Sequence, residues 1–230
     1  MKKSLLTILI SLCLIACLTG CKKEEKYNVL KDRPTTTQKV NTEEQEVENV
    51  KKTDELNYYT YITENRDVVA IFNNISNKNI DAHINMQYKD GSGKVIDTVI
   101  DSIYCIEPTK EVAIVLGENK EWDIYDLNVK SNESKKKSHL DQVKITHENT
   151  GKEIKVKITN TLKETIDSID VSVGYYDKDG ALVGFEHSDV VSLEGQLTGE
   201  LKIDYPRDNR NRKVDFATYK VYINEIYSEK

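Results

Sequence analysis

The chain has 230 residues, of which 38% are hydrophobic and 31% charged, and its formal net charge at pH 7 is −6. An acidic chain without a long basic stripe is a poor candidate for binding nucleic acid, so we expect no nucleic-acid partner. Three prolines, one tryptophan and four cysteines exclude the collagen-like and disulfide-rich classes.

The first 20 residues have the layout of a secretory signal peptide. Lys2 and Lys3 give a positive start, and an almost continuous apolar run follows from Leu5 to Leu18. That run is shorter than the roughly 20 apolar residues that span a bilayer, and a charged segment follows it at once. We therefore predict a cleaved signal peptide over residues 1–20, with an uncleaved anchor helix as the alternative.

The segment Leu18–Cys21 reads Leu-Thr-Gly-Cys and matches a lipobox, the sequence at which bacteria lipidate a cysteine and then cleave just before it. We expect Cys21 to be lipidated and to hold the protein at the extracytoplasmic face of the cell membrane. Two or more acyl chains make a stable anchor, whereas one is marginal. Cys17 also follows a small residue and is the alternative. Cys21 is favoured because the apolar run before it is fuller.

Only Cys105 is left once the leader is removed and Cys21 is modified, so the mature chain can form no intrachain disulfide. Cys105 lies among apolar neighbours. We expect it to be buried as a small apolar residue rather than exposed as a reactive thiol.

Residues 21–54 are dominated by Lys, Glu, Thr, Asn and Gln with isolated valines. Such a stretch cannot bury enough apolar surface to offset the entropy lost on ordering it. We predict a disordered tether that holds the folded part off the membrane. A coil of this length averages roughly 30 Å end to end and reaches about 110 Å at most.

The rest of the chain contains an internal repeat. Val69–Asn73 recurs as Val156–Asn160, an offset of 87 residues, and near the end Trp122–Tyr125 recurs as Phe216–Tyr219, an offset of 94. The second copy therefore carries an insertion, which lies between Tyr205 and Lys213. The repeat predicts two homologous domains, over residues 55–130 and 138–230, joined by the polar linker 131–138. We expect Trp122 and Phe216 to be equivalent core residues.

Each copy has the pattern of short β-strands. In Ile169–Tyr175 apolar residues alternate with small or polar ones, the period of a half-buried strand. Asp179-Gly180 lies between two such runs and predicts a hairpin. Six or seven strands in about 85 residues favour an immunoglobulin-like β-sandwich in each copy, so the predicted fold class is all-β.

Over roughly Leu56 to Tyr227 each copy resembles the FxLYD-type domain of Gram-positive surface lipoproteins and its immunoglobulin-like relatives. The shared features are an Asn-rich turn, a strand that ends in Tyr-Asp-x-Asp-Gly, and a later Leu-x-Pro/Gly step; they are carried by Asn73-Asn74, Asn160-Thr161, Tyr176–Gly180 and Leu193–Gly195. The first copy departs from the pattern at its hairpin. The resemblance implies a fold and a surface location, and it supplies no catalytic residues.

No motif in the chain predicts a metal or cofactor. Asp177–Gly180 resembles the start of a calcium loop, but the twelfth residue of that loop would be Ser188 rather than glutamate. Ordinary turn chemistry explains the same residues, at Asp90 in the first copy as well. The four histidines form no His-x-x-x-His pair.

The insertion in the second copy is the candidate contact site. It places four positive residues on an acidic chain, namely Arg207, Arg210, Arg212 and Lys213. Because functional residues favour loops on rigid scaffolds, we expect these side chains to contact an anion or an acidic partner, such as a wall polymer or lipid headgroup. The alternative is a solvated loop tip, where insertions are tolerated.

Together these features predict a lipid-anchored, non-catalytic binding or scaffolding module with an envelope protein or wall polymer as its partner. One alternative is a passive structural spacer. Another is an envelope hydrolase that uses dispersed carboxylates, such as Asp97, Asp101, Glu186 and Asp189.

Overall fold

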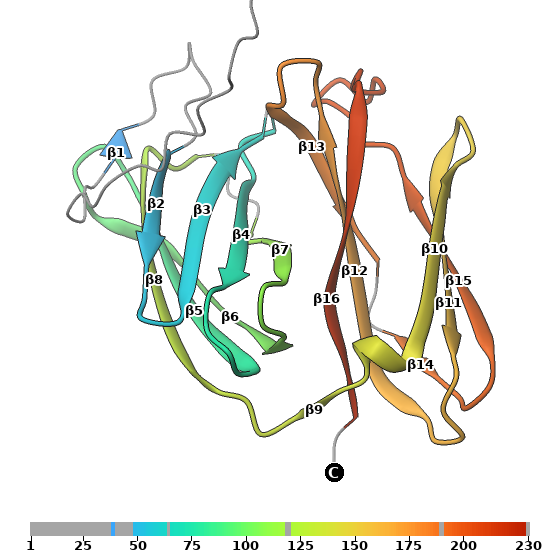
Figure 1. The fold of residues 1–230 in the computed structure, drawn as a ribbon. Coiled ribbons are helices and arrows are strands. Elements are labelled where there is room, and N and C mark those ends of the chain that lie inside the picture. The colour runs from blue at the N-terminus through green and yellow to red at the C-terminus, as the bar shows by residue number, and fades with distance from the viewer. Residues whose placement is uncertain (1–37, 40–47, 64, 118–120, 189–190, 229–230) are drawn as a thin grey trace, which may run out of the picture. The chain divides into compact units, whose positions relative to one another are not determined.

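The structure is a computed structural model that describes residues 38–39, 48–63, 65–117, 121–188 and 191–228. The described residues form antiparallel β-sheets and one short 3₁₀ helix, with no α-helix among them (Figure 1). The all-β prediction is confirmed. Residues 1–37 lie outside the described residues, so the predicted signal peptide, Cys17, Cys21 and most of the tether do too.

Eight strands build two four-stranded sheets in the first half of the described chain, with the orders β1-β8-β5-β6 and β2-β3-β4-β7. Their bounds are β1 (Gln38–Lys39), β2 (Glu48–Lys52), β3 (Leu56–Ile62), β4 (Val68–Asn74), β5 (Ile80–Lys89), β6 (Val95–Ile106), β7 (Glu111–Val115) and β8 (Ile124–Glu133). We call these two sheets the first sheet pair. They share one core, in which Leu56 and Phe72 of one sheet meet Met86 and Tyr88 of the other.

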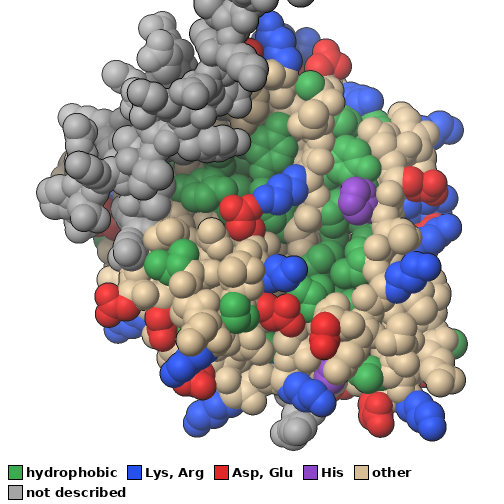
Figure 2. All heavy atoms as spheres, viewed as in Figure 1, with side chains coloured by type: hydrophobic (Ala, Val, Ile, Leu, Met, Phe, Trp, Pro, Cys, Tyr) green, Lys and Arg blue, Asp and Glu red, His purple; other side chains and the backbone are tan. Residues whose placement is uncertain are grey.

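The second half builds two further sheets, ordered β13-β12-β16-β9 and β10-β11-β15, with β14 beside β12. The elements are β9 (Lys137–Ser138), η1 (Leu140–Gln142), β10 (Val143–Asn149), β11 (Glu153–Asn160), β12 (Ile166–Tyr176), β13 (Leu182–His187), β14 (Val191–Leu193), β15 (Thr198–Asp204) and β16 (Thr218–Ser228). We call these sheets the second sheet pair. Their core is separate, and hydrophobic side chains packed on it reach the surface between β16 and β10 (Figure 2).

The repeat appears in the topology. The order β9-β16-β12-β13 matches β1-β8-β5-β6 strand for strand, which makes β12 the equivalent of β5, β16 of β8 and β13 of β6. Two tyrosines mark the match, because the hydroxyl of Tyr88 donates to the carbonyl of Leu116 at 2.6 Å and that of Tyr175 to the carbonyl of Asp204 at 2.9 Å. These tyrosines have the predicted offset of 87 residues.

A fully buried asparagine at the end of equivalent strands corrects the predicted alignment by one residue. The side-chain amide of Asn74 donates to the carbonyls of Lys78 and Ile106, both at 2.7 Å. That of Asn160 donates to the carbonyls of Glu164 at 2.9 Å and Leu193 at 3.0 Å. Asn74, not Asn73, is therefore the counterpart of Asn160, and each ties a turn to the strand end that faces it.

The insertion of the second copy repeats a turn that the chain uses twice elsewhere. Asp90, Asp177 and Asp208 each accept, through Oδ1, the N–H groups two and four residues later. In all three turns the residue three positions after the aspartate has a positive φ: 86° at Gly93, 84° at Gly180 and 60° at Asn211. Glycine and asparagine are the residues that adopt this conformation most readily. The aspartates thus have turn partners of their own.

Two segments predicted as tether and linker are partly strand. Within residues 21–54, β2 pairs with β3 and β1 pairs with β8. In the linker, β8 continues to Glu133 and β9 pairs with β16, so only residues 134–136 join the two halves. Strand pairing uses backbone groups and needs no apolar side chain, which is why a polar composition did not reveal these strands.

The two sheet pairs pack against each other through a third apolar cluster. Val69, Ile71 and Ala113 lie on the outer side of β4 and β7, and they meet Leu182, Phe185 and Tyr222 from β13 and β16. Tyr59, Tyr61 and Tyr176 pack around this cluster. The outer face of the sheet β13-β12-β16-β9 is therefore covered by the first sheet pair.

Candidate functional site

The outer face of the sheet β1-β8-β5-β6 carries a compact set of polar side chains. Along β5 the burial alternates, because Ile84, Met86 and Tyr88 fill the core while His83, Asn85 and Gln87 point outward. The neighbouring strand β8 supplies the facing residues, and the register pairs His83 with Lys130, Asn85 with Asn128 and Gln87 with Asp126. We call these six residues the polar face.

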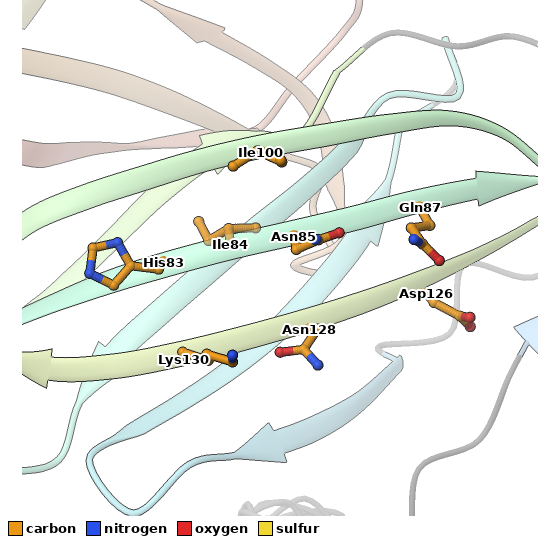
Figure 3. A pocket seen from close by; sticks show the side chains of 8 residues that line it. All are labelled: His83, Ile84, Asn85, Gln87, Ile100, Asp126, Asn128 and Lys130. Carbon is orange, nitrogen blue, oxygen red and sulfur yellow. The ribbon is translucent and has the colours of Figure 1, made fainter.

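The polar face lines a shallow hollow of about 440 Å³, in the range of ligand pockets (Figure 3). On the β6 side the hollow is bordered by Ile100, which faces Asn85 in the register and is 77% exposed. The hollow is thus lined by six polar residues and by two isoleucines, Ile84 and Ile100. A ligand lying across the three strands would meet all of them.

The two ends of the polar face are held by local contacts. His83 is fixed through both ring nitrogens, Nδ1 to the Ser102 hydroxyl at 3.0 Å and Nε2 to the Asn132 side-chain oxygen at 2.7 Å. At the other end Asp126 forms an ion pair with Lys89. These contacts order the rim of the hollow and neutralise its one carboxylate.

The side chains in the middle of the polar face have hydrogen-bonding groups that are available to a ligand. Among the described residues, no side-chain hydrogen bond or ion pair engages Asn85, Gln87, Asn128 or Lys130. Each amide presents two N–H donors and an acceptor oxygen, and Lys130 adds an ammonium group. The arrangement can therefore pair with a ligand that carries both hydroxyl and anionic groups.

The equivalent face in the second copy is closed. There β12 presents Ser168, Asp170 and Ser172, and β16 presents Tyr222 and Asn224, and this face packs on the first sheet pair. Ser172 and Asn224 are only 1% and 2% exposed. The same surface is thus a buried contact in one copy and an open, polar hollow in the other.

The predicted contact loop is ordered mainly by bonds within itself. Arg212 pairs with Asp208 at 2.7 Å, Arg207 donates to the carbonyl of Asn211 at 3.0 Å, and Lys213 lies 3.8 Å from the centre of the Tyr205 ring. Within the described residues, Arg210 is the one predicted cation whose side chain makes no contact of these kinds with another residue. The loop keeps its positive charge, but most of that charge is already engaged.

The carboxylates of the hydrolase alternative come from different strands. Asp97 and Asp101 lie on β6 of the first sheet pair, whereas Glu186 lies on β13 of the second, and Asp189 lies outside the described residues. Within the described ranges, no three His, Cys, Asp or Glu side chains are grouped so that they could hold a metal ion. Burial raises the pKa of two other carboxyl groups, Asp170 and Glu225, which lie at the contact between the sheet pairs.

Two further predictions have a clear outcome. Cys105 is buried, as expected, and this burial raises the pKa of its thiol. Trp122 is fully buried, whereas its counterpart Phe216 is only partly buried. The two aromatic residues are therefore unequal as core anchors.

Sequence reasoning missed the polar face because its residues alternate like those of any solvated strand. The signal that could have found it is the repeat itself. At the positions of His83, Asn85 and Gln87, the second copy has Asp170, Ser172 and Gly174, smaller residues that allow close packing.

No protein-family model matches the chain, and no curated protein matches it. The resemblance to FxLYD-type domains accordingly rests on the sequence motifs alone. In the part of the chain that the structure describes, no helix is long and apolar enough to cross a membrane.

Proposed function

We propose that this chain is a non-catalytic binding module, held on the extracytoplasmic face of the cell membrane by a lipid on Cys21. In this proposal each sheet pair is an immunoglobulin-like β-sandwich domain. The lipobox motif supports the anchor, and two separate cores with matching strand order support the tandem domains.

The polar face is the proposed binding site. The observation that carries this assignment is the difference between the copies: one sheet face is buried against a neighbour, while the equivalent face is open with unengaged amide groups. Asn85 and Asn128 lie opposite each other at its centre, and Lys130 is the next outward-facing residue along β8. This arrangement fits a hydroxyl-bearing, anionic polymer of the cell envelope, because amides pair with hydroxyls and Lys130 with the anionic group.

Binding to purified cell-wall polymer tests the site. We expect the double variant Asn85→Ala/Asn128→Ala of the soluble mature chain, residues 22–230, to lose about thirtyfold in affinity, since two lost hydrogen bonds contribute about 1 kcal/mol each. Co-sedimentation with the polymer measures this. The matched control is Thr146→Ala/Lys202→Ala, which removes exposed strand residues of the second sheet pair. Equal binding by all three proteins would reject the polar face, and no binding by any would favour the passive spacer.

The anchor has its own test. Cys21→Ala is expected to abolish incorporation of a labelled fatty acid and to release the protein from the membrane fraction, because Cys21 is the proposed attachment point. The matched variant Cys17→Ala should leave both unchanged. Labelling that is lost only in Cys17→Ala would move the anchor to that residue.

A further inference from the structure

Strand β16 contains a β-bulge at the contact between the two sheet pairs. In its pairing with β12, Ile223 faces Val171 and Glu225 faces Asp170, so Asn224 is an extra residue between them. A bulge redirects side chains that would otherwise alternate between the faces of a sheet. Here it lets two consecutive side chains, Asn224 and Glu225, point toward the first sheet pair.

These two side chains bind the edge strands of both sheets in the first pair. Asn224 Oδ1 accepts the backbone N–H of Ala113 on β7 at 2.8 Å, and Glu225 Oε1 accepts that of Tyr104 on β6 at 3.0 Å. β7 and β6 each end the strand order of their sheet. Unpaired edge N–H groups need partners, and one bulge provides them for two sheets.

Side chains of β12 form hydrogen bonds with the same two residues. Asn224 Nδ2 donates to the Ser172 hydroxyl at 2.7 Å and lies 3.3 Å from Asp170 Oδ2. The Ser168 hydroxyl donates to Glu225 Oε2 at 3.0 Å. Asp170 Oδ1 is buried and has no hydrogen-bond partner among the described residues. An ionised Asp170 is therefore incompletely solvated at this position.

The charges around the contact are mostly negative. Asp170 and Glu225 face each other on neighbouring strands, and Asp101 of β6 adds a third carboxylate near Asp170. One ammonium group opposes them, because Lys136, in the connection between β8 and β9, lies near Glu225; the imidazole of His187 on β13 lies near Asp170. Lys136 is held between the rings of Tyr104 and Tyr227, at 4.3 and 3.9 Å from their centres.

Burial raises the pKa of both facing carboxyl groups. For Glu225 the main cause is desolvation, and the charge of Asp170 raises its pKa further. For Asp170 desolvation again dominates, with Asp101 adding to it. A carboxyl group with a raised pKa in the packed state binds its proton more tightly there. Its contribution to the packed state is complete at low pH and is lost as the pH rises through the raised pKa.

We propose that Asp170, Asn224 and Glu225 form a pH-dependent latch, which holds the two sheet pairs together when the two carboxyl groups are protonated and loosens when both are ionised. The proton comes from the solvent and returns to it. Loosening frees the edge N–H groups of Tyr104 and Ala113 and uncovers Tyr222, so the proposal predicts which atoms become accessible.

Amide hydrogen exchange tests the latch in the mature chain. At each pH the protection of the Tyr104 and Ala113 amides is divided by that of Lys157, an amide in strand β11 of the second sheet pair. We expect this ratio to fall about tenfold or more as the pH rises from about 4 to about 8, because both carboxyl groups lose their protons over this range. A ratio that stays constant with pH would overturn the proposal, whatever the variants do.

Three variants separate proton binding from packing. Glu225→Gln and Asp170→Asn retain side-chain oxygens that can accept hydrogen bonds but cannot ionise, so together they should hold the ratio constant at its acidic value. Asn224→Ala should lower the protection of the Ala113 amide at every pH, because it removes an acceptor that does not titrate. The matched control is Glu148→Gln, an exposed carboxylate of β10 in the other sheet of the second pair, which should keep the wild-type pH profile. A wild-type profile in Glu225→Gln/Asp170→Asn would also reject the latch.

Discussion

Asn74→Ala is expected to lower the free energy of unfolding by about 3–5 kcal/mol. Asn74 is fully buried, its amide group donates to two backbone carbonyls, and Oδ1 accepts the N–H of Ser76 at 2.9 Å and its hydroxyl at 2.8 Å. Alanine would leave these groups without their partner, and each buried unsatisfied group costs about 1–3 kcal/mol. Urea denaturation of the mature chain measures the change.

Asn73→Ala is the matched control for this prediction. Asn73 precedes Asn74 on β4, and its Oδ1 is buried without a hydrogen-bond partner among the described residues. Replacing it removes no such bond, so we expect a change of less than about 1 kcal/mol. Asn160→Ala should behave like Asn74→Ala. A larger loss at Asn73 than at Asn74 would restore the alignment that the sequence alone predicts.

The strands and their turns follow from local rules and were largely predictable. Period-two alternation identified Ile169–Tyr175, which lies within β12, and Asp179-Gly180 identified the hairpin to β13. Gly180 has a φ of 84°, the conformation that this turn requires. Such signals depend on neighbours in sequence, so one chain is enough to reveal them.

Which outer face is covered depends on packing between distant segments, and the sequence did not reveal it. Ser172 and Asn85 are both polar residues at outward positions of equivalent strands. Ser172 is 1% exposed because the first sheet pair covers it, and its hydroxyl accepts a hydrogen bond from Asn224. Asn85 remains exposed. Polar character marks both as non-core, and only tertiary structure separates a buried polar contact from an open site.

The insertion is a second case in which the sequence did not reveal the contacts, here those of charged side chains. Four cations within a few residues predict an anion contact, and Asp208 in the same segment predicts a turn. The turn uses the Asp208 carboxylate, and hydrogen bonds from the backbone N–H and side chain of Arg212 hold the pKa of that carboxyl below its usual range. The sequence showed the charges but not that the loop engages most of them, because the fold of the loop decides which partner each cation meets.

Trp122→Ala is expected to cost about 3–5 kcal/mol of stability, the second large effect. The indole is fully buried between Tyr88 and Tyr125, with both ring centres at 5.5 Å, and its N–H donates to the carbonyl of Arg66 at 3.3 Å. Phe216→Ala is the matched control from the other copy. It should cost about half as much, because part of that ring is already in solvent. Thermal or urea unfolding measures both, and equal losses would contradict the difference in burial.

The same variant separates stability from binding. Strand β8 begins at Ile124, just after Trp122, and carries half of the polar face, so Trp122→Ala should weaken polymer binding only to the extent that it unfolds the first sheet pair. Asn85→Ala/Asn128→Ala should weaken binding while leaving the free energy of unfolding within about 0.5 kcal/mol of the wild type, because these side chains are exposed. If both variants lost binding only in proportion to their unfolded fraction, the polar face would have no role beyond structure, and the chain would be a spacer.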